Sequence, residues 1–466
     1  MADNFRPPAP RPRERPLGFM ALLAVLSRNP LECWTARHFE ELIVDGGLPV
    51  GRAVLVHDPG AIRRVLLENA ANYRKDRLQK RVLSAGMSEG LLSAEGHRWR
   101  AQRRLSAPVF AARSVREFAP AMLSAARALV GSWPGRGETI DAAVEMRRVT
   151  LDVLERTIFT DGLGRDAEDI RRAMATYFDI IGRVSALDLV GAPEIIPRLG
   201  RWRVRPTVRL FEASIDDMIL ARRKVLNEHP ERAPGDMLTR LLTACDAEDG
   251  ARLSPAEVRS NILTFFAAGH ETTANTLTWS LYLLSQSPEW RERVEAEAAV
   301  AFEGPTEGLA ERLVETRAVI EEAIRLYPPI AAISRVAMGA DELGGTRVRR
   351  GTLVVISPYV LHRHHRLWDH PELFEPGRFL GEARARIDRF AYLPFGAGPR
   401  TCIGSAFALQ EAAIVLAAVA RRARLRLAPD QTVWPLLRVT LRPAAGLRMV
   451  VNRRPAREVS AALARA

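Results

Sequence analysis

The sequence predicts a single, mainly α-helical domain with a small β portion. Helical periodicity of apolar residues dominates the 466-residue chain, and strand-like runs are confined to short stretches near 51–57, 342–357 and 446–452. Hydrophobic residues make up 47% of the chain, which is enough for a large buried core. Neither a repeat nor a linker divides the sequence, so residues 17–466 are expected to form one domain.

A long helix near the middle of this domain has the clearest predicted boundaries. Ser254, Pro255 and Glu257 form a capping box, with the serine as cap, the proline at the first helical position and the glutamate at the third. The helical pattern continues to about residue 286, a length of roughly 45–50 Å. Ser287 and Pro288 then begin another helix. A helix this long, and apolar on most sides, is expected to cross the middle of the protein.

The N-terminal segment, residues 1–16, is rich in arginine and proline and is predicted to be disordered. An apolar stretch follows at 17–26 and ends at Ser27 and Arg28. It is shorter than the roughly 20 residues that span a bilayer, and a small-residue cleavage site does not follow it. We therefore expect a cytoplasmic protein without a transmembrane anchor or a signal peptide.

Charge and cysteine content narrow the class of protein. Lysine and arginine together number 68 against 55 carboxylates, and all but Lys75, Lys80 and Lys224 of the cations are arginine. A solvated arginine-rich surface and a docking face for an acidic electron donor both fit this pattern, whereas a nucleic-acid-binding module is not visible. Three distant cysteines disfavour a disulfide scaffold and leave a single cysteine available as a metal ligand.

The segment 395–404, FGAGPRTCIG, carries the strongest functional signal. Its glycines, at 396, 398 and 404, let the backbone pass close to a flat group. The apolar run from Ala406 predicts a helix whose positive end would stabilise a thiolate. Here the sequence resembles the cytochrome P450 family, whose haem loop has the pattern F-x-x-G-x-R-x-C-x-G. All five fixed positions match, namely Phe395, Gly398, Arg400, Cys402 and Gly404.

The resemblance implies a cytochrome P450 fold, with a long central helix over a buried haem b. It implies that Cys402 is the axial ligand of the haem iron, that Arg400 pairs with a haem propionate and that Phe395 packs beside the sulfur. A thiolate ligand pushes electron density onto iron and favours cleavage of the O–O bond. The alternative is an inert buried cysteine in a glycine-rich turn.

Further segments follow in the family's order. Glu322 and Arg325 match E-x-x-R, and Arg378 lies in P-x-R-F. The resemblance implies a buried carboxylate between two arginines, with a role in folding and haem retention, whereas the alternative is an exposed helix ion pair.

Two shorter matches concern the haem propionates. Trp99 and Arg103 fit W-x-x-x-R, which places both on one side of a helix, and Arg335 matches the family's other propionate arginine. A core tryptophan and a surface arginine are the alternatives. The histidine tract at 362–365 resembles a metal site, but it also matches a structural meander of the family, so metal binding is not expected there.

The long helix contains the run Ala268-Gly269-His270-Glu271-Thr272-Thr273. Glycine and β-branched threonine both weaken a helix, which favours a functional reason for them. The run matches the family pattern A/G-G-x-D/E-T-T, which implies oxygen activation. In this interpretation Thr272 holds a water in a groove opened by Gly269, and Glu271 brings protons inward. The alternative is a kinked helix with a solvated glutamate.

The acid–threonine pair favours a monooxygenase that uses O₂ and two electrons over a peroxide-dependent oxidase or a non-catalytic haem sensor. A flavin or iron–sulfur segment is not visible, so electrons are expected from a separate ferredoxin and its reductase, acting on a monomer. The resemblance places the pocket between 83–93, 177–196 and the helix face around Ala268, and apolar walls predict a hydrophobic small-molecule substrate. The predicted walls are Phe265, Phe266, Ile330, Ile333 and Leu436.

Overall fold

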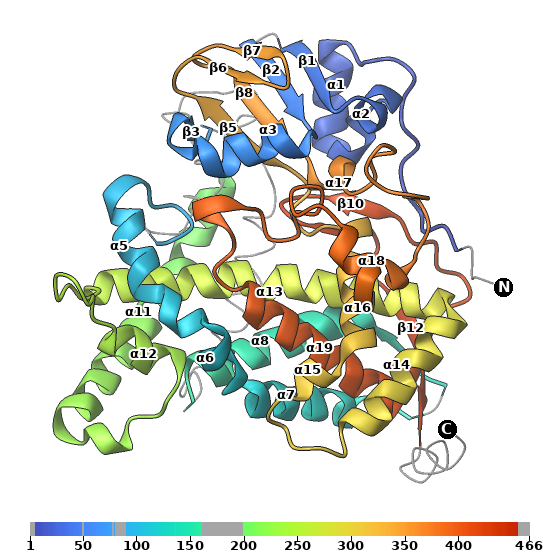
Figure 1. Ribbon diagram of the computed structural model, residues 1–466. Coiled ribbons are helices and arrows are strands. Elements are labelled where there is room, and N and C mark those ends of the chain that lie inside the picture. Colours follow the sequence, from blue (N-terminus) through green and yellow to red (C-terminus); the bar gives the residue numbers. More distant parts are fainter. Residues whose placement is uncertain are drawn as a thin grey trace.

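The structure is a computed structural model, and it describes residues 5–48, 51–76, 79, 90–135, 137–160 and 199–454. Helices fill the larger part of the molecule, and a five-stranded sheet lies at one end of it (Figure 1). The mainly helical architecture with a small β portion is therefore confirmed.

The central helix, α13 (Pro255–Gln286), crosses the middle of the molecule (Figure 1). Its predicted capping box is present, because the Ser254 hydroxyl accepts from the backbone N–H of Glu257 and the Glu257 carboxylate accepts from that of Ser254. The helices packed against α13 are α8 (Ala142–Ile158), α16 (Val314–Leu326), α19 (Ser405–Arg422), α11 (Leu199–Glu228), α12 (Met237–Thr243) and α14 (Pro288–Ala301). Most of α13 is buried, as its apolar sequence predicts.

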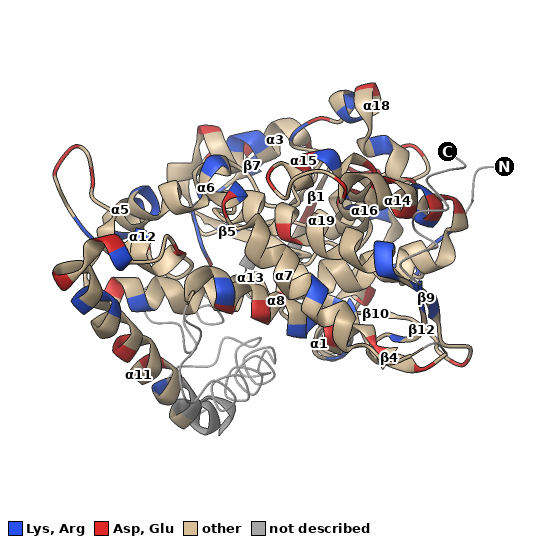
Figure 2. Ribbon diagram, turned by 90° about the horizontal axis from the view of Figure 1, so that it is seen from below, with Lys and Arg blue, Asp and Glu red and all other residues tan. Residues whose placement is uncertain are grey.

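The outer helices carry most of the charge. Figure 2 shows both signs along α11, in contrast to the largely uncharged α13 and α19. The remaining helices are α1 (Phe19–Arg28), α2 (Ala36–Glu40), α3 (Pro59–Arg63), α5 (Gly96–Ser106), α6 (Ala112–Arg116), α7 (Ala119–Ser132), α15 (Leu309–Arg312), α17 (Pro358–Leu361) and α18 (Gly381–Arg386).

The largest sheet has the strand order β1-β2-β8-β5-β3. Its strands are β1 (Ile43–Leu48), β2 (Gly51–Val56), β8 (Leu353–Ile356), β5 (Ile333–Ala337) and β3 (Tyr73–Arg74). Only the β2–β8 pair within this sheet is parallel. The strand predicted near 51–57 is β2, in which Ala53, Val54 and Val56 are buried and Leu55 is half-buried.

Three smaller sheets complete the β portion. They are the hairpins β6 (Asp341–Leu343) with β7 (Thr346–Val348) and β10 (Pro435–Leu437) with β11 (Leu441–Pro443), and the sheet of β4 (Thr139–Asp141), β12 (Arg448–Arg453) and β9 (Ala423–Leu427). The strand predicted near 446–452 is β12. The β10–β11 hairpin matters for function because it is tied to α13, as described below.

The N-terminal segment differs from the prediction of disorder for residues 1–16, since residues 5–16 lie against the body. The Phe5 ring packs edge-on against Tyr282, with 6.1 Å between ring centroids. Backbone oxygens of the segment accept hydrogen bonds, from the Tyr327 hydroxyl to Pro8 at 2.8 Å and from the backbone of Phe374 to Phe5 at 3.1 Å. Prolines lack an N–H, and their carbonyls serve here as acceptors for donors of the body. Among the described helices, none is long and apolar enough to cross a membrane.

Candidate functional site

The 395–404 loop folds back so that Cys402 lies beside Phe395. The Cys402 backbone N–H donates to the Phe395 carbonyl at 2.9 Å, and that of Thr401 donates to Gly398 at 3.1 Å. Gly396 and Gly398 have φ angles of +70° and +71°, which L side chains rarely adopt. The helix predicted after the cysteine is α19, which begins at Ser405.

Gly398 and Gly404 of this loop differ in how much space their neighbours leave for a side chain. A Cβ at Gly398 would lie 1.7 Å from the backbone oxygen of Leu66, so the loop can pass this neighbour only without a side chain. Gly404 has a φ of −88°, and a Cβ there would make an ordinary contact with the Phe110 ring at 3.8 Å. Both glycines are fixed positions of the loop pattern in the sequence. In the structure, a close backbone approach requires only Gly398 of the two.

A Gly398→Ala variant is expected to be far less stable than a Gly404→Ala variant. The first combines a left-handed backbone with a collision against the Leu66 carbonyl, and we expect a loss of about 3 kcal/mol or more in the free energy of unfolding. The second needs no backbone change, and we expect a loss below about 1 kcal/mol. Urea unfolding of both variants checks this, and equal losses would contradict the close approach.

The Cys402 thiol is subject to opposing influences. Burial raises the pKa of Cys402, while the backbone N–H of Gly404 and the positive charge of Arg103 lower it. Among the other cysteines, Cys33 is half-buried and burial raises its pKa to about 11, whereas Cys245 is exposed. The Cys402 side chain is exposed despite its surroundings, so it is open to a ligand on one side.

A cluster of arginines lies near this thiol. The Arg400 guanidinium stands 3.9 Å above the Trp99 ring, donates to the Ala94 carbonyl at 3.0 Å and lies 3.3 Å from a Glu95 carboxylate oxygen. Burial lowers the pKa of Arg400, and the positive charges of Arg335 and Arg103 lower it further. The structure therefore brings together residues that the sequence places on three separate segments.

The same cluster has an excess of positive charge. Arg335 on β5 donates to its neighbour's carbonyl and lies 3.4 Å from the Gln79 amide oxygen. Burial lowers the pKa of Arg335, and the charges of Glu95 and Asp76 oppose this. Lys75 adds a further cation 3.8 Å from Glu95. Buried cations call for compensation, so an anionic group with more than one carboxylate fits this place.

Lys75 and Glu95 were not identified from the sequence. Glu95 and Arg98 match the short pattern E-x-x-R, which occurs elsewhere in the chain by chance. The sequence separation of Glu95 from Arg400 does not indicate that the two residues are neighbours. Lys75 donates to the Leu92 carbonyl at 2.5 Å, a contact that likewise depends on the fold. Only the three-dimensional arrangement shows both residues beside the arginines.

The predicted carboxylate–arginine cluster is present, but its two arginines lie at different distances from Glu322. Glu322 and Arg325 are fully buried and form a bidentate pair at 2.6 and 2.8 Å. Arg378 lies farther off, with its Nε 3.8 Å from Glu322, and it donates to the His370 carbonyl at 3.0 Å. The Glu322–Arg325 pair is therefore the centre of the cluster, and Arg378 lies at its edge.

On α13, Thr272 and Ala268 share the face that is not buried. The Thr272 hydroxyl donates to the Ala268 carbonyl one turn earlier, at 2.6 Å. Ala268 is exposed and Thr272 half-exposed, although the flanking turns of the helix are buried. Gly269 lies against α8, where a Cβ would lie 3.3 Å from Leu154, and its predicted groove beside Thr272 stays a prediction. Its absent side chain allows the two helices to approach each other.

Glu271 has a partner that the sequence did not indicate. Its carboxylate lies 3.9 Å from the guanidinium of Arg442 on β11. The β10–β11 hairpin is fixed to α13 by Asn275, which donates to Thr440 at 3.0 Å, and by Trp279, which donates to the Leu441 carbonyl at 3.1 Å. The hairpin thus holds a cation beside the acid that precedes Thr272.

Comparison with known proteins decides the family. The model of the family described as "Cytochrome P450" matches residues 42–449. The chain belongs to the cytochrome P450 family. As a member of it, this P450 is a monooxygenase that holds haem b and oxidises hydrophobic molecules.

Several relatives of this P450 are from Streptomyces. Cyclooctat-9-en-7-ol 5-monooxygenase of Streptomyces melanosporofaciens is 36% identical over 88% of each chain. Cyclooctatin synthase of the same organism is 32% identical over 93% of each chain. Pentalenene oxygenase of Streptomyces avermitilis is 30% identical over 78% of this chain and 80% of its own. Among solved structures, the haem domain of cytochrome P450DA is 26% identical, with a TM-score of 0.82 over 97% of this chain and 99% of that one.

The predicted pocket walls divide into two groups. Ile330 is exposed, and Leu436 lies directly opposite Arg442 in the β10–β11 hairpin. Ile333 starts β5, with its Cδ1 3.9 Å from the Cβ position of Gly396, which places it against the cysteine loop. Ile333 and Leu436 therefore lie close to candidate site residues. Residues 83–89 and 177–196, also predicted to line the pocket, lie outside the described residues.

Phe265 and Phe266 are core residues in the structure, contrary to their predicted place in the pocket. Phe265 packs edge-on against Phe110 at 4.8 Å between centroids. Phe266 is fully buried between Phe159 at 5.9 Å and Phe211 at 5.5 Å. Both side chains are used by aromatic packing, so the exposed face of α13 at Ala268 is the part that can meet a substrate.

Two other features of this P450 lie outside the site. His362 is buried and its Nε2 accepts from the Leu393 backbone at 2.8 Å, and the described residues contain no cluster suited to a metal ion.

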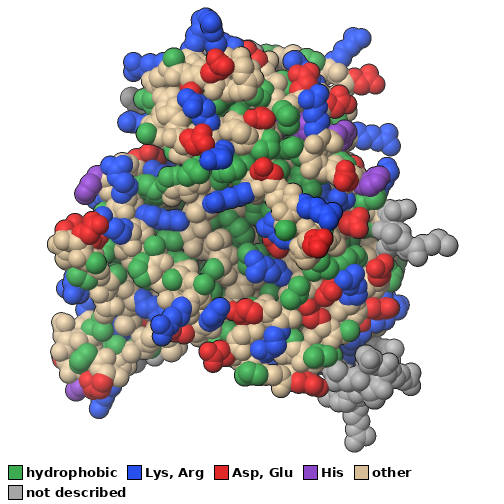
Figure 3. Space-filling model, in the orientation of Figure 1, with side chains coloured by type: hydrophobic (Ala, Val, Ile, Leu, Met, Phe, Trp, Pro, Cys, Tyr) green, Lys and Arg blue, Asp and Glu red, His purple; other side chains and the backbone are tan. Residues whose placement is uncertain are grey.

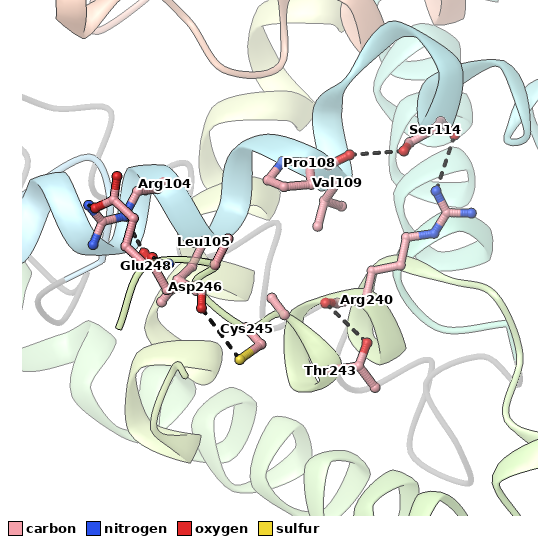
Figure 4. A pocket seen from close by; sticks show the side chains of 12 residues that line it. Arg104, Leu105, Pro108, Val109, Ser114, Arg240, Thr243, Cys245, Asp246 and Glu248 are labelled. Atoms are coloured by element: carbon pink, nitrogen blue, oxygen red, sulfur yellow. Dashed lines mark hydrogen bonds and ion pairs between the residues drawn. The ribbon is translucent and has the colours of Figure 1, made fainter. Parts of the chain in front are cut away.

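A cavity of about 540 Å³ lies between α5 and α12 (Figure 4). Its charged groups are paired with neighbours, Arg104 with Glu248 at 3.3 Å and Arg240 with Glu117. The cavity therefore has no free charge to bind a ligand.

Proposed function

We propose that Cys402 is the axial ligand of the haem iron and that Arg103, Arg335 and Arg400 hold the haem propionates. Haem b carries two carboxylates, which suit an arginine cluster whose cations outnumber its carboxylates. Bound there, haem b supplies the binding and reduction of O₂. The observation that carries this proposal is that Cys402 is exposed and lies near enough to Arg103 for that positive charge to lower the pKa of the thiol.

We propose that Thr272 and Glu271 control protons on the other side of the site. The Thr272 hydroxyl donates to Ala268, which leaves its oxygen lone pairs to accept from a water on the exposed face of α13. Glu271 is half-buried next to Arg442, a position from which it can take protons from solvent and pass them inward. Positioned acid–base groups of this kind contribute about 10²–10⁴ in rate.

The substrate that we propose is an apolar, cyclic terpene-like molecule. Support comes from the relatives, which are named for cyclooctat-9-en-7-ol, cyclooctatin and pentalenene. It also comes from the predicted pocket walls, because Ile333 lies beside the cysteine loop and Leu436 lies opposite Arg442, the partner of Glu271, and both are apolar. A screen of cyclic terpenes, pentalenene among them, would identify binders by the shift of the haem absorption.

Electrons are proposed to come from a separate acidic ferredoxin and its reductase, acting on a cytoplasmic monomer. The face that carries α5, α18 and α19 shows a row of lysine and arginine side chains across its middle (Figure 3). On α5 the exposed arginines are Arg98, Arg100 and Arg104. Positive charge on the cysteine side of the site would speed the association of an acidic donor.

A Thr272→Ala variant is expected to consume electrons while forming less product. Substrate binding and the first reduction need no proton at Thr272, so both should stay near wild type. Without the hydroxyl, protons arrive wrongly placed, and O₂ is released as hydrogen peroxide after taking up two donor electrons and two protons. Glu271→Gln should instead slow the consumption of the electron donor, because the proton supply falls before the step at which product and hydrogen peroxide formation diverge. We expect product per electron pair to fall about tenfold or more in Thr272→Ala.

The measurement compares product, oxidised donor and released peroxide for the terpene that gives the largest absorption shift. Thr273→Ala is the matched control, since Thr273 is buried on another side of the same helix. Added hydrogen peroxide should restore some product to both site variants. Wild-type coupling in Thr272→Ala would show that the relay assignment is wrong and would favour a peroxide-dependent enzyme.

A further inference from the structure

Glu95, the residue directly before α5, turns its carboxylate toward the arginine cluster of the site. A side-chain oxygen at the start of a helix commonly accepts from backbone N–H groups of the first turn, but Glu95 makes no such hydrogen bond. Instead one of its oxygens lies 3.3 Å from the Arg400 guanidinium and the other lies 3.8 Å from the Lys75 ammonium. The carboxylate therefore bridges two cations rather than capping the helix.

Both cations are fixed to the stretch of chain that leads into Glu95. The Arg400 guanidinium donates to the Ala94 carbonyl at 3.0 Å. Lys75 donates to the Leu92 carbonyl at 2.5 Å, and only 8% of its side chain is exposed. Solvent screens such shielded charges weakly, so their effect reaches farther than that of surface charges.

The described residues of this cluster carry more positive than negative charge. The cations are Lys75, Arg103, Arg335 and Arg400, and the carboxylates are Glu95 and Asp76. Four cations against two carboxylates leave two positive charges, which the two propionates of haem b would neutralise. Without Glu95, one of these cations would stay uncompensated even with haem bound.

The two carboxylates differ in how far hydrogen bonds offset their charge. One oxygen of Asp76 accepts from the backbone N–H of Gln79 at 2.9 Å, and the other accepts from the Ser334 hydroxyl. The Oε1 atom of Glu95 is buried and accepts no hydrogen bond. The charge of Glu95 therefore acts mainly on its two cations and on whatever group lies beside them.

We propose that Glu95 is a positioning residue that sets how readily the haem takes up an electron, through its charge beside Lys75 and Arg400. Reduction adds a negative charge to the haem, so a nearby carboxylate disfavours the reduced form and a nearby cation favours it. Glu95 therefore lowers the reduction potential of the haem, whereas Lys75 raises it. The inference rests on the proposed function, because it takes the haem propionates to lie at the arginine cluster.

The test is a spectroelectrochemical titration of the substrate-free holoenzyme. Glu95→Gln removes the charge and keeps the shape of the side chain, so the ratio of reduced to oxidised haem at a fixed potential should rise about threefold or more. A threefold change corresponds to a shift of about 30 mV, since a tenfold change is about 59 mV for one electron. Lys75→Gln should change the ratio in the opposite direction, and the double variant should lie close to wild type.

Two controls separate the effect of charge from that of structure. Glu95→Asp keeps the charge and should stay near the wild-type potential. Glu248→Gln removes a carboxylate that lies 3.3 Å from Arg104 of α5 but is 80% exposed, and it should leave the potential unchanged. Haem content and the reduced carbon monoxide spectrum of each variant show whether the comparison is made between intact thiolate-ligated proteins.

The proposal is overturned if Glu95→Gln shifts the potential no more than Glu248→Gln, if Glu95→Asp shifts it as far as Glu95→Gln, or if Lys75→Gln leaves it unchanged. Arg335→Gln distinguishes this failure from that of the proposed function, because it removes a propionate cation and should lower the potential. A lower potential in Arg335→Gln with an unchanged one in Glu95→Gln overturns the role of Glu95 alone. Unchanged potentials in both variants overturn the propionate assignment and the role of Glu95 together.

Discussion

A Cys402→Ser variant is expected to lose the far-red-shifted Soret band that thiolate-ligated haem gives when it is reduced under carbon monoxide. Serine has nearly the same shape as cysteine, so the backbone hydrogen bond from residue 402 to Phe395 and the start of α19 should persist. A serine hydroxyl does not ionise near neutral pH and cannot supply the electron density of a thiolate. We expect complete loss of the band and of oxygen-dependent turnover.

The other two cysteines provide the controls. Cys33→Ser and Cys245→Ser should keep the band, because burial raises the pKa of Cys33 to about 11 and Cys245 lines the cavity in Figure 4, which lies outside the site. The measurement is the reduced carbon monoxide difference spectrum of the three variants. If Cys33→Ser or Cys245→Ser removes the band while Cys402→Ser keeps it, the ligand assignment fails.

The features predicted correctly from the sequence are local ones. The capping box of Ser254 and Glu257 involves residues three apart, so its geometry follows from the sequence alone. The turn from Phe395 to Cys402 is likewise continuous in the chain, and the helix after it follows from its apolar periodicity. Residues brought together by such short segments need no knowledge of the rest of the fold.

The features missed depend on which neighbour each helix face meets. The sequence shows that Phe266 and Gly269 lie on α13, but not that Phe266 turns toward Phe159 and Phe211 or that Gly269 meets Leu154. Arg442 is 171 residues from Glu271, and its spacing gives no sign of the ion pair. Such contacts are set by how helices and hairpins pack, which periodicity does not specify.

The N-terminal segment shows the limit of composition. Arginine and proline are typical of disordered segments, because such residues bury little apolar surface. Here a single aromatic residue, Phe5, packs against Tyr282, and Arg13 donates to the Glu32 carbonyl at 2.6 Å. A few specific contacts with an existing surface are enough to hold an extended chain, and composition does not record them.

The second large effect is expected at Glu322 and Arg325. Beyond its bidentate pair with Glu322, Arg325 donates to the carbonyls of His362 and Pro371 at 2.8 Å and of Leu373 at 2.9 Å. Its guanidinium therefore joins α16 to the meander that leads to the cysteine loop. Removing either partner leaves a buried charge without compensation, which costs about 3–5 kcal/mol.

Arg378 should behave differently from these two. It is partly exposed, and without it Glu322 keeps both hydrogen bonds from Arg325 and a third from the Glu375 backbone at 2.8 Å. We expect Arg378→Ala to cost about 1–2 kcal/mol, because the side chain is mostly buried but its removal leaves Glu322 with its hydrogen bonds. The resemblance to the family does not rank Glu322, Arg325 and Arg378 by their effect on stability. The smaller loss for Arg378→Ala is therefore predicted from the geometry of the cluster.

Urea unfolding and haem content would measure the order directly. Glu322→Ala and Arg325→Ala should yield little haem-containing protein, because about 3–5 kcal/mol is a large share of a typical folding free energy. Arg378→Ala should retain most of its haem. Glu382→Ala serves as the control, since Glu382 and Arg386 form an ion pair at 3.2 Å with both side chains largely exposed, and we expect a change within about 0.5 kcal/mol. Wild-type stability in Glu322→Ala would show that the buried pair does not hold the meander to α16.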